Sequence, residues 1–119
     1  ISANNRNSLY GGGSSSTRGI FFGGYITTDI EFITIATTGN SQDFGDLTVA
    51  RFQGTGLSSS TRDVLVGNRI SPGSSNGNTI DYIEIATTGN AVDFGDLSSD
   101  LGSETGYGGQ SNGHGGLSG

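Results

Sequence analysis

Residues 30–47 read IEFITIATTGNSQDFGDL and residues 80–97 read IDYIEIATTGNAVDFGDL, with thirteen of the eighteen positions identical at an offset of 50. Upstream, SSSTRGIFFGGY at 14–25 corresponds to SSSTRDVLVGNR at 58–69, at an offset of 44. Self-similarity at such a spacing is typical of architectures in which similar units pack on one another. The sequence therefore predicts two copies of one module.

The two offsets differ by six residues, which predicts an inserted surface loop at 69–79 in the second copy. This stretch contains Pro72, the only proline of the chain, and proline and glycine favour turns. The expected segments are the end of a preceding unit (1–13), unit one (14–57), unit two (58–101) and a Gly/Ser-rich closing strand or tail (102–119).

The apolar pattern within each unit predicts short β-strands. Ile30 and Phe32 would face one side of a strand. Ile33 and Ile35 would face the other side, and residues 80–85 repeat the pattern. A strand that is apolar on both faces is expected to be buried on both, as in a sheet stacked between two others. Each unit is expected to hold three or four antiparallel strands over about 44–50 residues, the size of one propeller blade.

The composition points to an all-β chain. Gly, Ser, Thr and Asn fill 62 of the 119 positions, whereas Leu, Ile, Val and Phe together fill 27. A large helical core is excluded because Lys and Met are absent, Ala is scarce, and each Gly disfavours a helix interior by about 1 kcal/mol.

Several classes of function are disfavoured by what the chain lacks. Without Cys there is no disulfide, thiolate chemistry or Cys-based metal site, and without Lys there is no Schiff-base amine. The net charge of −6 opposes binding to nucleic acid. No apolar run approaches the roughly 20 residues needed for membrane insertion. Because the sequence starts at Ile1 and has no Met, we expect a processed product or part of a longer chain.

Unit one resembles the kelch repeat. The residues that carry the resemblance are the apolar strand closed by a double glycine (Phe22-Gly23-Gly24), the apolar strand at 30–35, the aromatic after a turn (Phe44) and the trailing Arg51. Kelch repeats commonly have Trp where Phe44 stands, and unit two departs further, with Gly67-Asn68 for the double glycine and Leu101 for the arginine. The phrase IATTGN-x-x-DFGDL together with SSSTR is similar to kelch-like repeats in virion structural proteins of tailed phages infecting marine cyanobacteria. The likeness covers residues 14–101.

This resemblance implies kelch-like β-propeller blades in a non-enzymatic structural protein of a phage virion: a tail, fibre or surface decoration. The expected location is the virion or the extracellular space, and the expected partners include other virion proteins. The alternative is a secreted bacterial adhesin or extracellular filament subunit. Two units cannot close a ring of four to eight blades. We therefore expect the blades to be incomplete in one chain and to associate with copies of the chain, as a homo-oligomer, or with further repeats of a longer one.

Recognition of a host-surface glycan is a secondary hypothesis. The loops at 25–29 and 68–79 differ between the units, and variable loops on a constant sheet commonly carry specificity. Tyrosines beside glycine runs could stack on sugars, although tyrosine is equally common at protein interfaces. The candidate ligand or partner residues are Tyr25, Asp29, Asn68, Arg69, Asn76 and Tyr107.

A repeated set of oxygen side chains gives a candidate metal site, since Ca²⁺ favours clustered oxygen ligands from loops. The set comprises Asn40, Asp43 and Asp46 in unit one and Asn90, Asp93 and Asp96 in unit two. The alternative is that these side chains cap turns, accept hydrogen bonds from backbone amides or pair with arginines. Duplication in both units favours this alternative, so no cofactor is expected, with Ca²⁺ as the less favoured possibility.

Other conspicuous residues are expected to be structural. Arg18 and Arg62 follow the same Ser-Ser-Ser-Thr phrase, and a pair with a neighbouring acid is favoured over a carboxylated sugar ligand. The full set of expected structural residues is Arg18, Arg51, Arg62, Gly23, Gly24, Phe44 and Phe94.

The sequence predicts no enzyme. The Asp-Phe-Gly triplets at 43–45 and 93–95 match the magnesium-binding motif of kinases, but the HRD motif and the strand lysine of kinases are missing. His114, the only histidine, lies between glycines with no positioned partner apparent. A hydrolase domain on a propeller frame would need a nucleophile–base pair that the sequence does not supply.

Overall fold

The computed structural model describes residues 11–23, 27–51, 54–67, 69–71 and 75–98, and it confirms that the described chain is all-β. Two four-stranded antiparallel sheets follow one another along the chain. Sheet A contains, in order, β1 (Gly11–Ser14), β2 (Arg18–Phe22), β3 (Thr27–Thr34) and β4 (Gln42–Arg51). Sheet B contains β5 (Gly54–Ser58), β6 (Arg62–Gly67), β9 (Thr79–Glu84) and β10 (Val92–Asp96).

The inserted segment at 69–79 is not only loop. Its described part forms a small antiparallel hairpin of β7 (Arg69–Ser71) and β8 (Ser75–Asn76), with β7 beside β4. Strand β9 then begins at Thr79.

The repeated phrase SSSTR forms the turn between the first two strands of each sheet. In sheet A, Ser15 Oγ accepts hydrogen bonds from the backbone amides of Thr17 and Arg18 at 3.2 and 3.1 Å. In sheet B, Ser59 Oγ accepts from Thr61 and Arg62 at the same two distances. Serine hydroxyls that bond to the backbone in this way stabilise turns, which explains why this phrase recurs in both units.

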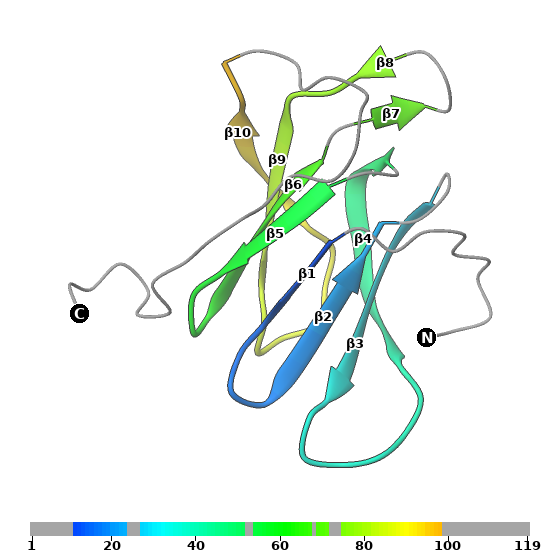
Figure 1. Cartoon of the computed structure of the whole chain (residues 1–119), viewed down its shortest axis with the longest axis vertical. Coiled ribbons are helices and arrows are strands. Elements are labelled where there is room, and N and C mark those ends of the chain that lie inside the picture. Colours follow the sequence, from blue (N-terminus) through cyan, green and yellow to red (C-terminus); the bar gives the residue numbers. More distant parts are fainter. Residues whose placement is uncertain (1–10, 24–26, 52–53, 68, 72–74, 99–119) are drawn as a thin grey trace.

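The two sheets stack with their strands in the same order, so that β1 lies beside β5 and β4 lies beside β10 (Figure 1). The edge formed by β1 and β5 is closed by close backbone contact. Ser14 N donates to Ser58 Oγ at 3.2 Å, and a Cβ on Gly56 would overlap the carbonyl oxygen of Gly12.

The opposite edge is closed by the 85–91 loop of sheet B, which runs along β4. Gly89 N donates to Phe44 O and Ala91 N donates to Asp46 O, both at 2.8 Å. Between them, Asp46 N donates to the side-chain Oδ1 of Asn90 at 3.1 Å. We call this set of hydrogen bonds the β4 seam.

Equivalent faces of the two sheets point in the same direction. We call the face with Arg18, Ile20 and Phe22 the front of sheet A, and the face with the matching residues, Arg62, Val64 and Val66, the front of sheet B. The front of sheet A packs on the back of sheet B. Sheet A contributes Ile20, Phe22, Ile30, Phe32, Phe44 and Leu47 to the core, and sheet B contributes Leu65, Ile83, Ile85 and Ala91.

The expectation that each apolar strand is buried on both faces is wrong for the single chain. In β3, Ile30 and Phe32 are buried, but Ile35, just beyond the strand, is 54 % exposed. In sheet B the opposite face is covered, and Ile83 and Ile85 are buried. The physical reason is that two stacked sheets cover only the two faces that lie between them.

Candidate interaction surface

The front of sheet B carries a cluster of Arg62, Tyr82 and Phe94. The guanidinium carbon of Arg62 lies 4.4 Å from the centroid of the Tyr82 ring, within the range of a cation–π contact. Tyr82 and Phe94 meet edge to face, with centroids 6.0 Å apart and an interplanar angle of 81°. Arg62 Nε and Nη2 donate to one oxygen of Glu84 at 3.1 and 3.0 Å. This ion pair is half-exposed, so it orients the guanidinium more than it stabilises the fold.

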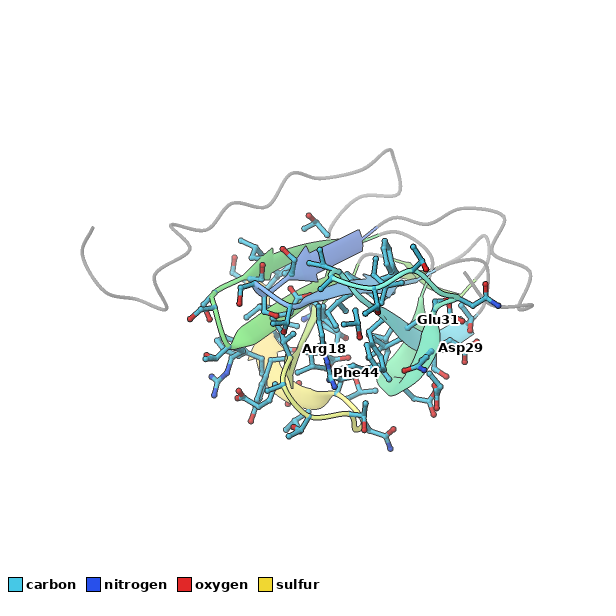
Figure 2. All side chains as sticks on the ribbon, turned by 90° about the horizontal axis from the view of Figure 1, so that it is seen from below. Arg18, Asp29, Glu31 and Phe44 are labelled. Atoms are coloured by element: carbon cyan, nitrogen blue, oxygen red, sulfur yellow. The ribbon has the colours of Figure 1, made fainter. Side chains whose placement is uncertain are left out.

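The same cluster occurs on the front of sheet A, where it is enclosed between the sheets. Arg18 lies 4.4 Å from the Phe32 ring, and Phe32 meets Phe44 edge to face at 5.9 Å and 84°. Arg18 Nη1 donates to the carbonyl oxygen of Ile85 at 2.9 Å, which joins it to sheet B. Figure 2 shows Arg18 and Phe44 in the space between the sheets.

The two clusters differ in their exposure to solvent. Phe44 is 3 % exposed and Phe94 is 54 % exposed. Every core residue of sheet A has an apolar counterpart on the front of sheet B. These counterparts of Ile20, Phe22, Ile30, Phe32, Phe44 and Leu47 are Val64, Val66, Ile80, Tyr82, Phe94 and Leu97. The open front of sheet B therefore repeats the residue pattern of the buried interface.

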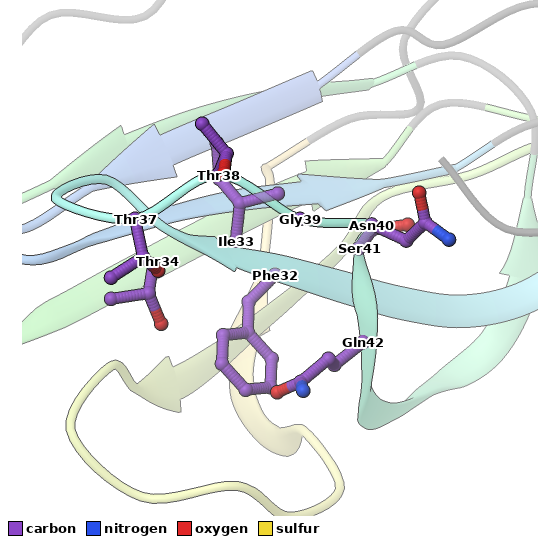
Figure 3. Close-up of a pocket in the computed structure, with 9 residues that line it drawn as sticks. All are labelled: Phe32, Ile33, Thr34, Thr37, Thr38, Gly39, Asn40, Ser41 and Gln42. Carbon is purple, nitrogen blue, oxygen red and sulfur yellow. The ribbon is translucent and has the colours of Figure 1, made fainter.

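Each sheet has a pocket beneath the loop that follows its third strand. The sheet B pocket, of about 190 Å³, is lined by Tyr82, Thr88 and Gly89 and also by Phe44 of sheet A. Among the described residues, the matching sheet A pocket, of about 250 Å³, is lined by positions within 32–42 and by none of sheet B (Figure 3). Phe44 of sheet A thus lines the sheet B pocket. No described residue of sheet B lines the sheet A pocket.

The back of sheet A completes the set of open surfaces. Ile85 is 1 % exposed because the front of sheet A covers it, whereas the identical position in unit one, Ile35, is 54 % exposed. Phe21 and Ile33, which match the buried Leu65 and Ile83, are half-buried on the same back face.

Asp63 is a buried carboxylate on the back of sheet B. It is fully buried, and neither oxygen has a hydrogen-bond partner within the described part of the chain. Its carboxylate lies against β1, where a Cβ on Gly13 would overlap it. Burial raises the pKa of Asp63 to about 7, because desolvation disfavours the charged form. Unit one has Gly19 at the matching position, so this carboxylate belongs to sheet B alone.

A second buried acid, Asp81, ties the two sheets together. Thr48 of β4 donates to it from the backbone nitrogen at 3.1 Å and from Oγ1 at 2.7 Å. The matching Glu31 is also buried and accepts a hydrogen bond from Ser41 Oγ at 3.2 Å. These acids are used as structural hydrogen-bond acceptors.

Two of the six predicted metal ligands, Asp46 and Asn90, take part in side-chain hydrogen bonds. Asp46 Oδ1 accepts from Thr28 Oγ1 at 3.1 Å, and Asn90 Oδ1 accepts from the Asp46 amide. Asn40, Asp43, Asp93 and Asp96 are exposed. Over the residues with described placement, no group of three His, Cys, Asp or Glu side chains could hold a metal ion. The Asn90 contact is of the kind that the backbone-bonding alternative predicts, whereas Asp46 accepts from a side-chain hydroxyl. The Ca²⁺ site stays a prediction.

The predicted structural residues lie as follows. Arg62 pairs with an acid of its own sheet, as expected for such arginines, whereas Arg18 binds a backbone carbonyl. Gly23 has a φ of +83° directly after β2, a conformation that favours glycine. Phe44 is a core residue, but Phe94 is exposed. Gly24 and the side chain of Arg51 lie outside the described residues.

The predicted ligand residues are mostly outside the described part. The residues outside the described part are Tyr25, Asn68, Tyr107 and also His114. Of Arg69 and Asn76, the structure describes only that they belong to β7 and β8. Asp29 lies in β3 and is half-buried; its amide donates to Thr27 Oγ1 at 3.1 Å.

Sequence reasoning missed Asp63 and the open front of sheet B. The signal for Asp63 was one substitution, SSSTRD in place of SSSTRG. The signal for the open front was the apolar residue at each matched position, but the pattern at 80–85 predicts burial on both faces.

No family model matches this chain, and no curated protein does either. Within the described residues, no helix is long and apolar enough to cross a membrane.

Proposed function

We propose that this chain is a non-enzymatic structural protein of a phage particle, in a tail, fibre or surface decoration, whose kelch-like blades act by stacking on further copies of themselves. The resemblance of the repeat to phage virion proteins supports this setting. The observation that carries the proposal is that an apolar residue stands at every position matching the sheet A core, on a face of sheet B that the described chain leaves open.

The exposed residues support a role in binding. An isolated repeat cannot cover both of its apolar faces, which is why repeats stack. Phe94 is more than half exposed on the edge strand β10, on a face whose other matched apolar residues are half-buried. Apolar patches of this kind mark interaction surfaces.

The chemistry of the front of sheet B suits a protein partner. Arg, Tyr and Phe are enriched in the centres of protein interfaces, and the cluster of Arg62, Tyr82 and Phe94 has this composition. Its residues are already held in the geometry of the buried cluster, with ring and cation distances that differ by at most 0.1 Å. A surface arranged in advance loses less conformational entropy on binding.

The propeller assignment rests on the same stacking. Four-stranded antiparallel sheets repeated about an axis are the blades of a propeller. Sheets A and B have four strands each in the same order, and they pack front to back as successive blades would. A ring of four to eight such blades would need about two to four chains with two blades each.

The test is self-association in solution, measured by sedimentation velocity. We expect the wild-type chain to sediment as a species larger than a monomer and Phe94→Glu to sediment as a monomer with an unchanged circular dichroism spectrum. Val92→Glu is the matched control. Val92 is 52 % exposed beside Phe94, but its counterpart Gln42 is exposed in unit one, so this variant should associate like the wild type. A monomeric wild-type chain at all accessible concentrations would refute the proposal.

A further inference from the structure

We infer that the front of sheet B binds the back of sheet A in a second copy of this chain, so that copies join head to tail. This inference rests on the proposed function and adds to it which two faces meet. The partner is defined by the contact that already exists inside the chain, where the front of sheet A covers the back of sheet B.

The first element of the inferred contact is Phe94. Within the chain, Phe44 lines the pocket beneath the 85–91 loop. The pocket beneath the 35–41 loop lies under the same IATTGN phrase and is larger, at about 250 Å³ against 190 Å³. Phe94 of one copy occupies the position relative to this second pocket that Phe44 occupies relative to the first.

The second element is a repeat of the β4 seam between copies. Gly39 N of one copy donates to Phe94 O of the other, as Gly89 N donates to Phe44 O within the chain. Asn40 accepts from the amide of Asp96, as Asn90 accepts from that of Asp46. The approach requires glycine at position 95, because a Cβ at the matching Gly45 would overlap Gly89 O. A Cβ at Gly95 would meet no atom of the described residues of its own chain within 4 Å.

The third element is the arginine. Arg18 uses Nη1 to bind the carbonyl oxygen of Ile85. Arg62 uses Nε and Nη2 for Glu84, so its Nη1 reaches the carbonyl oxygen of Ile35 in the second copy while the ion pair is kept. This contact covers Ile35, which is exposed in the single chain.

The contact within the chain buries the carboxylate of Asp63, and the contact between copies has no matching carboxylate. Gly19 stands on the back of sheet A where Asp63 stands on the back of sheet B. No carboxylate is buried there without a partner when the faces meet, so its desolvation does not oppose association.

Because the two faces differ, the contact is heterologous. Heterologous contacts give closed rings if the rotation between copies closes, and open filaments if it does not. Each copy then presents one front and one back. A variant with one face blocked can only end a series of copies, and two variants with opposite blocked faces can pair once.

The experiment mixes two variants, Phe94→Glu with a blocked front and Ile35→Glu with a blocked back. Each alone is expected to lose self-association by about thirtyfold or more, the factor for loss of one strongly contributing interface residue. Their equimolar mixture is expected to form a complex with one copy of each, measured by sedimentation velocity and native mass spectrometry. The matched controls are Val92→Glu and Ala36→Glu, because Ala36 and its counterpart Ala86 are both exposed. These controls should associate like the wild type.

The outcomes separate this inference from the proposed function. If the wild type associates and Ile35→Glu associates equally well, the back of sheet A is not the partner face, and the inference is overturned while the proposed function stands. A mixture that stays monomeric also overturns it, provided that both variants have wild-type circular dichroism spectra. A wild-type chain that never associates removes the proposed function together with the inference.

Discussion

Replacing Asp63 with Asn is expected to stabilise the protein at pH 8 by on the order of 4 kcal/mol relative to its effect near pH 4. The cause is the buried carboxylate, because burial raises the pKa of Asp63 from its ordinary value of 3.8 to about 7 in the folded protein. Below about pH 4 the group is protonated in both the folded and the unfolded state. Between about pH 4 and 7 the folded state holds a proton that the unfolded state has released. Wild-type stability therefore falls as the pH rises through this window, and the asparagine variant lacks this loss.

The measurement is urea unfolding of both proteins from pH 4 to pH 8. Asp93→Asn is the control for net charge, because it removes one exposed acid from the same sheet. The quantity of interest is the difference in the free energy of unfolding between Asp63→Asn and Asp93→Asn at each pH. If this difference is constant from pH 4 to pH 8, Asp63 is not a buried, uncompensated carboxylate.

Gly45→Ala is expected to destabilise the protein by about 3 kcal/mol more than Gly95→Ala. The two glycines are matched, with φ of +154° and +149°, so alanine is strained to a similar degree at both positions. Only the Cβ at position 45 would overlap the backbone of Gly89 and approach Asn90 N. The cost is overpacking plus weakening of the β4 seam, whose two backbone hydrogen bonds are 2.8 Å long.

The comparison is made by chemical unfolding in the Ile35→Glu background, so that association between copies does not contribute. Equal destabilisation by the two alanines would mean that the seam adds little to the stacking of the sheets. In the otherwise wild-type chain, Gly95→Ala should impair association, since it places a Cβ where the next copy is inferred to lie.

The sequence predicts the strands well because their cause is local. Apolar residues at 30–35 and 80–85, bounded by glycine and polar turns, are sufficient to predict antiparallel strands. The turn at SSSTR is also local, because the hydroxyl of its second serine accepts hydrogen bonds from the backbone amides two and three residues later. The hairpin at 69–76 was missed because its pairing is formed by backbone groups in a segment whose composition is typical of loops.

The direction in which each sheet faces could not be predicted from the sequence. Ile35 and Ile85 stand in identical IATTGN phrases, yet one is 54 % exposed and the other 1 %. The difference comes only from which neighbouring sheet is present, and a single repeat contains no information about its neighbour. For the same reason, the burial of Asp63 could not be predicted from the sequence. Asp63 is buried because the front of sheet A covers the back of sheet B.

Cysteine cross-linking tests directly whether the same stacking geometry occurs within one chain and between chains. Asp46 and Asn90 lie on neighbouring segments, because the Asp46 amide donates to the Asn90 side chain and Ala91 N donates to Asp46 O at 2.8 Å. We therefore expect their Cα atoms to lie in the range that a disulfide can bridge. The pair Asp46→Cys/Asn90→Cys is therefore expected to close within one chain and serves as the positive control. The chain has no native cysteine, so every cross-link reports an introduced pair.

The decisive variant is Asp96→Cys/Asn40→Cys, which places the same pair on the two open faces. On mild oxidation it is expected to give covalent dimers and higher multiples on a denaturing gel. Each single-cysteine variant can give at most a covalent dimer. If the double variant cross-links no further than the single variants while the control pair closes fully, front-to-back stacking between copies is contradicted.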